Sequence, residues 1–248
     1  MSFTVVIPSA GLGSRVGPYS KFLNKALVTV GDKPVITRVI EKFPSTATFV
    51  IILGYKGEMV EEVVRTLHPN LNFKFVYVKN FEGVGSGLGH SLSMAKEFLQ
   101  TPFIFIPNDA VIGIDNISLD PNSEGNWVGY YRKSSTDSYH PEDFRTLDIS
   151  EFGNDVVNIT GKGTLNQNIY VGICGVMDTE KFWAAMDIYD DPSVGEVVGL
   201  KALNSLKPVL IKEWFDCGSV AYLEQAKALF KNNDHNILEK EDESIWFQ

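Results

Sequence analysis

Short apolar runs alternate with segments of helical periodicity over the first half of the chain. Isolated apolar runs of four to eight residues bounded by turn residues predict buried strands, and apolar positions spaced three and four apart predict helices. The predicted strands are Thr4–Pro8, Thr48–Gly54, Phe73–Val78 and Thr101–Pro107. The predicted helices are Pro34–Phe43, Gly57–Leu67 and Leu88–Leu99. Such alternation is typical of a parallel sheet covered by helices on both faces.

The second half changes character, because most of its predicted strands follow one another without helices between them. These strands are Trp127–Arg132, Phe144–Ile149, Val156–Ile159 and Ile169–Met177. Helices return at Thr179–Met186, Val194–Leu203 and Ser219–Phe230. The expected fold class is α/β: a Rossmann-like three-layer sandwich with a mostly parallel central sheet and a small antiparallel or mixed extension at about 126–178. Residues 1–231 are expected to form one domain, and the acidic tail 232–248 could begin a following domain in a longer protein.

Composition and charge exclude several classes of function. The chain has 248 residues, of which 44% are apolar and 21% charged, as in ordinary globular proteins. A formal net charge of −9 would repel nucleic acid and anionic membranes, so neither is an expected partner. No apolar segment is long enough for a membrane helix, and the N-terminus lacks the features of a signal peptide. Cys174 and Cys217 have no metal-like spacing and are expected to be reduced thiols of a cytoplasmic protein.

A glycine-rich loop with nearby cations follows the first predicted strand. Gly11 and Gly13 come directly after the strand, then Arg15, and Lys25 lies ten residues further on. Glycine lets backbone N–H groups approach a ligand closely, and fixed positive charges favour a polyphosphate over a neutral metabolite. The loop is therefore predicted to bind a nucleotide.

The loop matches neither of two common nucleotide-binding motifs. A dinucleotide fingerprint has a third glycine three residues after the second, but Val16 stands at that position. The second strand also lacks the acidic residue expected for a ribose, and no Gly-Lys-Ser/Thr motif of a P-loop follows. An NAD(P)-binding Rossmann oxidoreductase stays open as an alternative, because such fingerprints vary.

The ordered motifs resemble those of the sugar-phosphate nucleotidyltransferases, also called nucleoside-diphosphate-sugar pyrophosphorylases, a family that includes phosphocholine cytidylyltransferases. The resemblance begins with residues 10–15, 25–28 and 31–34, and ends with 214–219. Weaker matches lie between them, at 54–55, 108–109, 161–163 and 170–172. The similarity thus extends over nearly the whole chain.

The resemblance implies a role for each matching residue. Ala10, Gly11, Gly13, Ser14, Gly83 and Ser86 would bind the nucleotide, and Arg15 and Lys25 would act as catalytic cations on its phosphates. Asp109 and Asp216 would bind catalytic Mg²⁺, and Lys162, Gly172 and Glu196 would bind the acceptor. Hard oxygen donors and bridging phosphates are the usual ligands of this cation. Asp109 and Asp216 could instead be turn or capping residues, and Lys162 an exposed lysine of a turn.

Three departures from the family pattern are visible. Asn24 replaces the usual proline before Lys25, and the segment Asn108-Asp109-Ala110 carries one carboxylate where many relatives have two. The segment Ser134–Glu142 matches no feature of the family. These departures leave the expected reaction type intact but leave the nucleotide and the acceptor open.

The resemblance implies an enzyme of the EC 2.7.7 type. It would transfer NMP from an NTP to a small phosphorylated acceptor, with a sugar 1-phosphate favoured, and release pyrophosphate for the synthesis of surface polysaccharide or capsule. Phosphocholine or another phospho-alcohol is the alternative acceptor, with CTP as the donor. A non-catalytic regulator that binds sugar nucleotides is the alternative of another class. The oligomeric state stays open, with a homo-oligomer compatible with the sequence.

Overall fold

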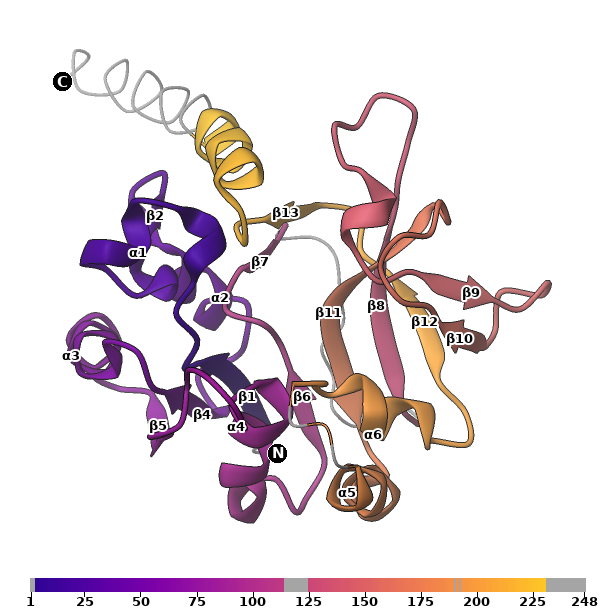
Figure 1. The fold of residues 1–248 in the computed structure, drawn as a ribbon, viewed down its shortest axis with the longest axis horizontal. Coiled ribbons are helices and arrows are strands. Elements are labelled where there is room, and N and C mark those ends of the chain that lie inside the picture. The colour runs from indigo at the N-terminus through magenta and orange to yellow at the C-terminus, as the bar shows by residue number, and fades with distance from the viewer. Residues whose placement is uncertain (1–2, 114–124, 190, 192, 231–248) are drawn as a thin grey trace, which may run out of the picture.

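The computed structural model describes residues 3–113, 125–189, 191 and 193–230. A seven-stranded sheet lies at the centre, in the order β12-β8-β11-β6-β1-β4-β5 (Figure 1). Its strands are β1 (Thr4–Ser9), β4 (Thr48–Leu53), β5 (Asn72–Tyr77), β6 (Phe103–Phe105), β8 (Trp127–Arg132), β11 (Asn168–Val176) and β12 (Lys207–Leu210). Strands β6, β1, β4 and β5 are parallel neighbours, whereas β11 runs antiparallel between β6 and β8. The expected mostly parallel sheet is confirmed.

Helices cover both faces of this sheet. Successive residues of a central strand therefore pack against helices on opposite faces. In β1, Val5 and Ile7 pack in one apolar cluster with residues of helices α2 (Val35–Ile40) and α3 (Gly57–Leu67). The intervening Val6 packs in a second cluster with residues of α4 (Leu88–Met94), α5 (Thr179–Ile188) and α6 (Val197–Lys201). Burial on both faces explains the continuous apolar runs that predicted these strands. The expected three-layer arrangement is confirmed.

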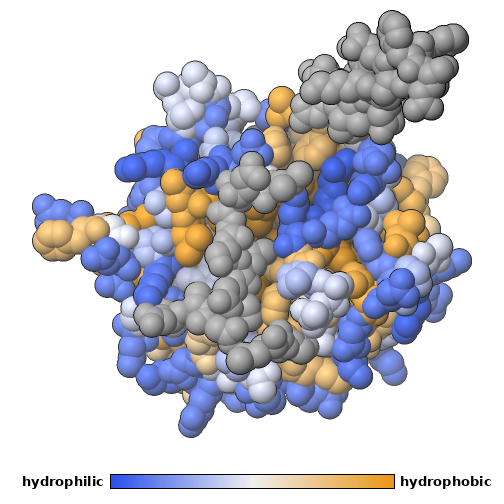
Figure 2. All heavy atoms as spheres, turned by 180° about the vertical axis from the view of Figure 1, so that it is seen from behind, coloured by the Kyte–Doolittle hydropathy of each residue, from blue (hydrophilic) through white to orange (hydrophobic). Residues whose placement is uncertain are grey.

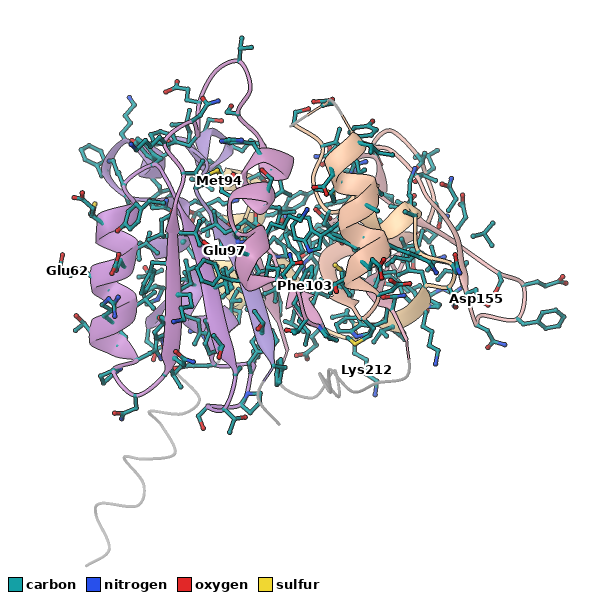
Figure 3. The ribbon with its side chains drawn as sticks, turned by 90° about the horizontal axis from the view of Figure 1, so that it is seen from below. Glu62, Met94, Glu97, Phe103, Asp155 and Lys212 are labelled. Carbon is teal, nitrogen blue, oxygen red and sulfur yellow. The ribbon has the colours of Figure 1, made fainter. Side chains whose placement is uncertain are left out.

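The smaller elements lie around this framework. They are η1 (Ser14–Val16), α1 (Tyr19–Phe22), η2 (Lys25–Leu27), β2 (Thr29–Val30), β3 (Lys33–Pro34), η3 (Lys96–Phe98), β7 (Ala110–Ile112), η4 (Pro141–Asp143), β9 (Leu147–Ile149), β10 (Val156–Ile159) and β13 (Trp214–Asp216). Strands β9 and β10 form an antiparallel pair that projects from the body, with Asp155 near its end (Figure 3). Phe103, labelled in the same view, packs against Phe182 of α5 with 5.6 Å between ring centroids. Residues 220–230 are helical, close to the predicted Ser219–Phe230.

Several boundaries differ from those predicted. The single helix expected at Leu88–Leu99 is divided into α4 and η3, because Ala95 leaves the helical conformation at φ −95° and ψ 0°. Leu92, Ala95 and Leu99 remain buried on the same side, so the apolar spacing looks continuous across the break. The short strands β7, β12 and β13 were not predicted, since three or four residues carry little periodicity. The predicted acidic tail 232–248 lies outside the described residues.

Candidate active site

The glycine loop after β1 lies directly against Lys25. Gly13 has φ +66°, a left-handed conformation that favours glycine, and a Cβ at this position would be 2.8 Å from Cβ of Lys25. Glycine at position 13 therefore allows the loop to approach the backbone that carries the lysine. Gly11, Ser14 and Arg15 are exposed on the same loop. The glycine loop and Lys25 thus lie against each other in the fold.

Asn24 anchors the turn that presents Lys25. Its side chain is 1% exposed and donates hydrogen bonds to the carbonyl oxygens of Ser9, at 2.9 Å, and Tyr55, at 2.6 Å. Its own carbonyl oxygen accepts a hydrogen bond of 2.9 Å from the amide of Ala26 and thereby caps η2. Asn24 thus connects the ends of β1 and β4 to the turn of Lys25. The rigidity that a proline would supply at this position is here supplied by side-chain hydrogen bonds.

Lys25 forms an ion pair with Asp109. Lys25 Nζ lies 2.6 Å from Asp109 Oδ2, and both side chains are largely shielded from solvent. Asp109 lies four residues beyond the end of β6, just before β7. Burial alone would raise the pKa of Asp109, but the charges of Lys25 and Arg15 and the hydrogen bond from Lys25 hold it below its usual value. Asp109 is therefore ionised at neutral pH.

Antiparallel pairing of β7 with β13 brings Asp216 beside Asp109. Asp216 is opposite Ala110 in the register, and the amide of Cys217 donates a 2.8 Å hydrogen bond to the carbonyl oxygen of Asp109. A Cβ on Gly218 would lie 2.6 Å from Asp109 Oδ2 and 3.1 Å from Asp216 Oδ1. The two carboxylates therefore flank a small space that the absence of a side chain at position 218 leaves open.

The second carboxylate differs from the first in its protonation. Burial and the negative charge of Asp109 raise the pKa of Asp216 to about 7, against the opposing charges of Lys25 and Arg15. Two carboxylates this close cannot both ionise freely without added positive charge. A divalent cation between them would supply that charge.

The donor set suits Mg²⁺ held jointly by protein and ligand. Among the residues that the structure describes, no group of three or more His, Cys, Asp or Glu side chains could hold a metal ion. Mg²⁺ in nucleotide enzymes is commonly bound by one or two carboxylates together with phosphate oxygens and water. Asp109 and Asp216 meet that requirement and no more, so the site would be completed by a phosphorylated ligand.

A cleft of about 370 Å³ opens beside these residues. Its lining combines the glycine loop, both ion-paired residues and the segment after β5: Pro8, Ala10, Gly11, Gly13, Arg15, Lys25, Phe81, Ser86, Gly87, Leu88, Ser91, Pro107, Asn108 and Asp109. Ser86 enters the cleft from a turn in which its hydroxyl donates a 2.7 Å hydrogen bond to the carbonyl oxygen of Gly83. Gly83 is exposed and shapes this turn at φ +80°. Most of the predicted nucleotide-binding residues are therefore gathered on one cleft.

The predicted acceptor residues lie outside the lining of this cleft. Lys162 is on an exposed turn, where lost hydration and the charge of Arg15 lower its pKa, while Asp143 and Asp216 oppose the shift. Lys162 is thus within electrostatic reach of Asp216. Gly172 has φ +87°, and a Cβ there would be 2.8 Å from Cγ of Pro107, so glycine permits β11 to approach the loop that carries Asp109.

Glu196 is placed differently from the other predicted acceptor residues. It is 6% exposed, and the hydroxyl of Tyr170 donates a 3.0 Å hydrogen bond to its Oε1. Burial raises the pKa of Glu196, while Tyr170 and the charge of Arg145 lower it. Tyr170 is on β11, two residues before Gly172, so Glu196 contacts the strand that carries Gly172.

Sequence reasoning missed Asn24 as an anchor, Gly218 as the space between the carboxylates, and Arg145. Arg145 is half-buried and acts electrostatically on both Lys162 and Glu196. The departure from proline was a signal for Asn24. No local pattern marks Arg145 or Gly218, because their relevance arises from neighbours distant in sequence.

One face of the molecular surface is mainly polar. Figure 2 shows a face covered largely by hydrophilic residues, on which hydrophobic residues form separate patches. Within the described part of the chain, no helix has the length and apolar character needed to cross a membrane.

Comparisons with known proteins identify relatives of this fold and sequence. No family model matches the chain. The bifunctional protein GlmU of Methanococcus maripaludis strain C7 is 24% identical over 161 residues, which are 63% of this chain and 35% of that protein. The chain thus spans about a third of the length of this curated relative. A putative UTP–glucose-1-phosphate uridylyltransferase of Bacillus subtilis strain 168 is 23% identical over 170 residues, 60% of each protein.

Solved structures share the same architecture. The crystal structure of a putative glucose-1-phosphate thymidylyltransferase from Bacillus anthracis, in complex with sucrose, matches with a TM-score of 0.73 at 18% identity. The match covers 93% of this chain and 96% of that one, which shows a common fold. The resemblance predicted from the motifs is confirmed: the chain is similar, in sequence and in fold, to the sugar-phosphate nucleotidyltransferases.

Proposed function

We propose that the protein is a Mg²⁺-dependent nucleotidyltransferase that transfers NMP from an NTP to a small phosphorylated acceptor, most favourably a sugar 1-phosphate, and releases pyrophosphate. The observation that carries the proposal is the convergence of Lys25, Asp109 and Asp216 beside a cleft lined by the glycine loop. Relatives whose names describe uridylyl and thymidylyl transfer to glucose 1-phosphate support the reaction type. The product would serve the assembly of surface polysaccharide or capsule.

In this proposal the cationic side chains bind phosphate groups and the carboxylates bind the metal ion. Arg15 and Lys25 neutralise the triphosphate, and Lys162 orients the phosphate of the acceptor, whose oxygen attacks the α-phosphorus as pyrophosphate leaves from the opposite side. The acceptor phosphate is already ionised near neutral pH, so no general base is needed. Bound Mg²⁺, held by Asp109 and Asp216, would neutralise phosphate charge as the bonds change. Positioning and charge neutralisation supply most of the catalysis of such a transfer.

Neither the nucleobase nor the acceptor follows from the residues on the cleft. Glycines and backbone groups, which leave little residue signature, make up much of the predicted base-contacting surface. Phosphocholine or another phospho-alcohol is therefore kept as the second acceptor class, with CTP as donor. We also propose a cytoplasmic location, which suits two free, buried cysteines among the described residues.

The test is pyrophosphate release with CTP, UTP, GTP and dTTP, each against a panel of sugar 1-phosphates, phosphocholine and related phospho-alcohols. We expect turnover with at least one pair in the presence of Mg²⁺, and none after Asp109→Ala or Asp216→Ala with the fold retained. Tight nucleotide binding without pyrophosphate release for any pair would favour a non-catalytic regulator. Binding of NAD(P) in a fluorescence titration would favour an oxidoreductase.

A further inference from the structure

Residues 134–145 form a segment that connects β8 to β9 and contacts both halves of the candidate site. Most of this segment carries no feature of the family that the chain resembles. It nevertheless makes hydrogen bonds to β13, to the turn of Lys162 and to the helix at 220–230.

At the metal side, Tyr139 holds the end of β13. Its hydroxyl donates a 3.1 Å hydrogen bond to the carbonyl oxygen of Trp214 and accepts a 3.3 Å hydrogen bond from the amide of Asp216. The ring stacks on Trp214, with 4.8 Å between centroids and 28° between planes. Within the described part of the chain, the three-residue strand β13 pairs with the equally short β7, so the hydrogen bonds of Tyr139 supplement a short ladder in holding Asp216.

At the acceptor side, the same segment holds the turn that carries Lys162. The amide of Gly163 donates a 2.9 Å hydrogen bond to the carbonyl oxygen of Glu142. The carboxylate of Asp143, which acts electrostatically on Lys162, accepts a 2.8 Å hydrogen bond from the hydroxyl of Tyr222. Tyr222 also accepts a 3.3 Å hydrogen bond from the amide of His140.

We propose that segment 134–145 is a positioning element that ties the metal ligand Asp216 to the acceptor ligand Lys162, with Tyr139 as the positioning residue for Asp216. The inference rests on the proposed function, because it takes the roles of Asp216 and Lys162 from there. One segment thus holds both the metal-binding and the acceptor-binding parts of the site, and substitutions can disturb the two parts separately. Tyr139 acts on the metal end, and Tyr222 acts on the acceptor end through Asp143.

Three changes, each removing one tyrosine hydroxyl, separate the two ends. Tyr139→Phe removes the hydrogen bonds with Trp214 and Asp216, and Tyr222→Phe removes those with Asp143 and the amide of His140. Tyr77→Phe is the matched control, because its hydroxyl donates a 2.6 Å hydrogen bond to Glu61, outside segment 134–145. Thermal unfolding checks that all three variants retain the fold.

Two measurements report separately on metal binding and on acceptor binding. Binding of Mn²⁺ together with each NTP, followed by electron paramagnetic resonance without an acceptor, reports the metal end. The KM for the acceptor reports the other end. We expect Tyr139→Phe, through the loss of its hydrogen bond with the Asp216 amide, to weaken binding of Mn²⁺–NTP about five-fold and leave the acceptor KM within about two-fold. Tyr222→Phe should raise the acceptor KM about five-fold and leave Mn²⁺–NTP binding unchanged.

Unchanged binding of Mn²⁺–NTP by Tyr139→Phe would overturn the proposal, as would equal effects of all three variants on both readouts. If the wild-type protein turns over and the variants behave alike, the proposed function stands and the positioning role is wrong. If the wild-type protein binds Mn²⁺–NTP without turnover and Tyr139→Phe alone weakens that binding, the positioning of Asp216 stands and the proposed transfer is wrong. A wild-type protein that binds no Mn²⁺–NTP would overturn both.

Discussion

Lys25 Nζ lies 2.6 Å from Oδ2 of Asp109, across 84 residues of sequence. The ion pair joins the turn after the glycine loop to the loop after β6, and so connects the predicted triphosphate cation to a predicted metal ligand. The lysine keeps Asp109 ionised before any ligand arrives. It is also close enough to the cleft to be shared with a phosphate oxygen once a nucleotide binds.

Removal of this cation should lower both metal binding and turnover. Lys25→Met leaves Asp109 partly buried without its partner, so the pKa of Asp109 should rise and kcat should fall by about 100-fold or more, the scale expected when an electrostatic stabiliser is lost. Steady-state pyrophosphate release measures the change. Lys96→Met is the control, since it breaks an exposed 2.7 Å pair with Asp187, and neither residue lines the cleft. Equal activity of the two variants would contradict the role of Lys25.

The metal-free protein should lose stability as pH rises, through Asp216. The pKa of Asp216 in the folded protein is about 7, raised by burial and by Asp109, whereas an unfolded aspartate titrates near 4. The folded state therefore holds a proton more tightly than the unfolded state, and this contribution is full below about pH 4 and lost as pH rises through about 7. Differential scanning calorimetry of the metal-free protein should show that the Tm of Asp216→Asn minus the Tm of wild type increases between about pH 4 and about pH 7.

The contribution of Asp109 to stability depends on pH in the opposite direction, so the contributions of Asp109 and Asp216 can be separated. Its pKa is lowered in the fold, so its contribution to stability is present above the unfolded value and is lost only as pH falls below about 4. Between pH 4 and 7, the difference between wild type and Asp216→Asn therefore reports Asp216. A difference independent of pH would contradict the raised pKa.

Asn24 should matter for stability and for catalysis. Asn24→Ala leaves the carbonyl oxygens of Ser9 and Tyr55 without these donors, at a cost of about 1–3 kcal/mol in the free energy of unfolding. It also frees the turn of Lys25, so kcat should fall while stability remains sufficient for folding. Asn72→Ala is the control, because its 2.9 Å hydrogen bond to Thr48 is exposed. Urea titration with parallel rate measurements checks both effects, and a fully active variant would show that Asn24 does not position Lys25.

Gly218→Ala should block the space between the carboxylates. The new methyl group would lie 2.6 Å from Asp109 Oδ2 and 3.4 Å from Nη2 of Arg15. We expect the loss of activation by Mg²⁺, which a titration of initial rate against Mg²⁺ concentration would show. Normal activation by Mg²⁺ would indicate that the cation does not occupy this space.

The sequence predicted the main sheet well, for a physical reason. Strands such as β1 and β4 are buried on both faces, so their apolar runs and flanking glycines are visible locally. The three-residue strands β7 and β13 carry no such pattern. Their conformation depends on each other, and no local signal contains that dependence.

The residue types of the candidate site could be recognised in the sequence, since a glycine loop with Arg15 and Lys25 favours a polyphosphate ligand. Their arrangement was decided by tertiary structure. The pairing of β7 with β13 sets Asp109 beside Asp216, and the position of Lys162 near Arg15 depends on the turn held by residues 134–145. The amino-acid sequence by itself determined the fold class and the chemistry available. The contacts that give Asp216 its raised pKa and Lys25 its partner join residues far apart in the chain, so only the folded protein could decide them.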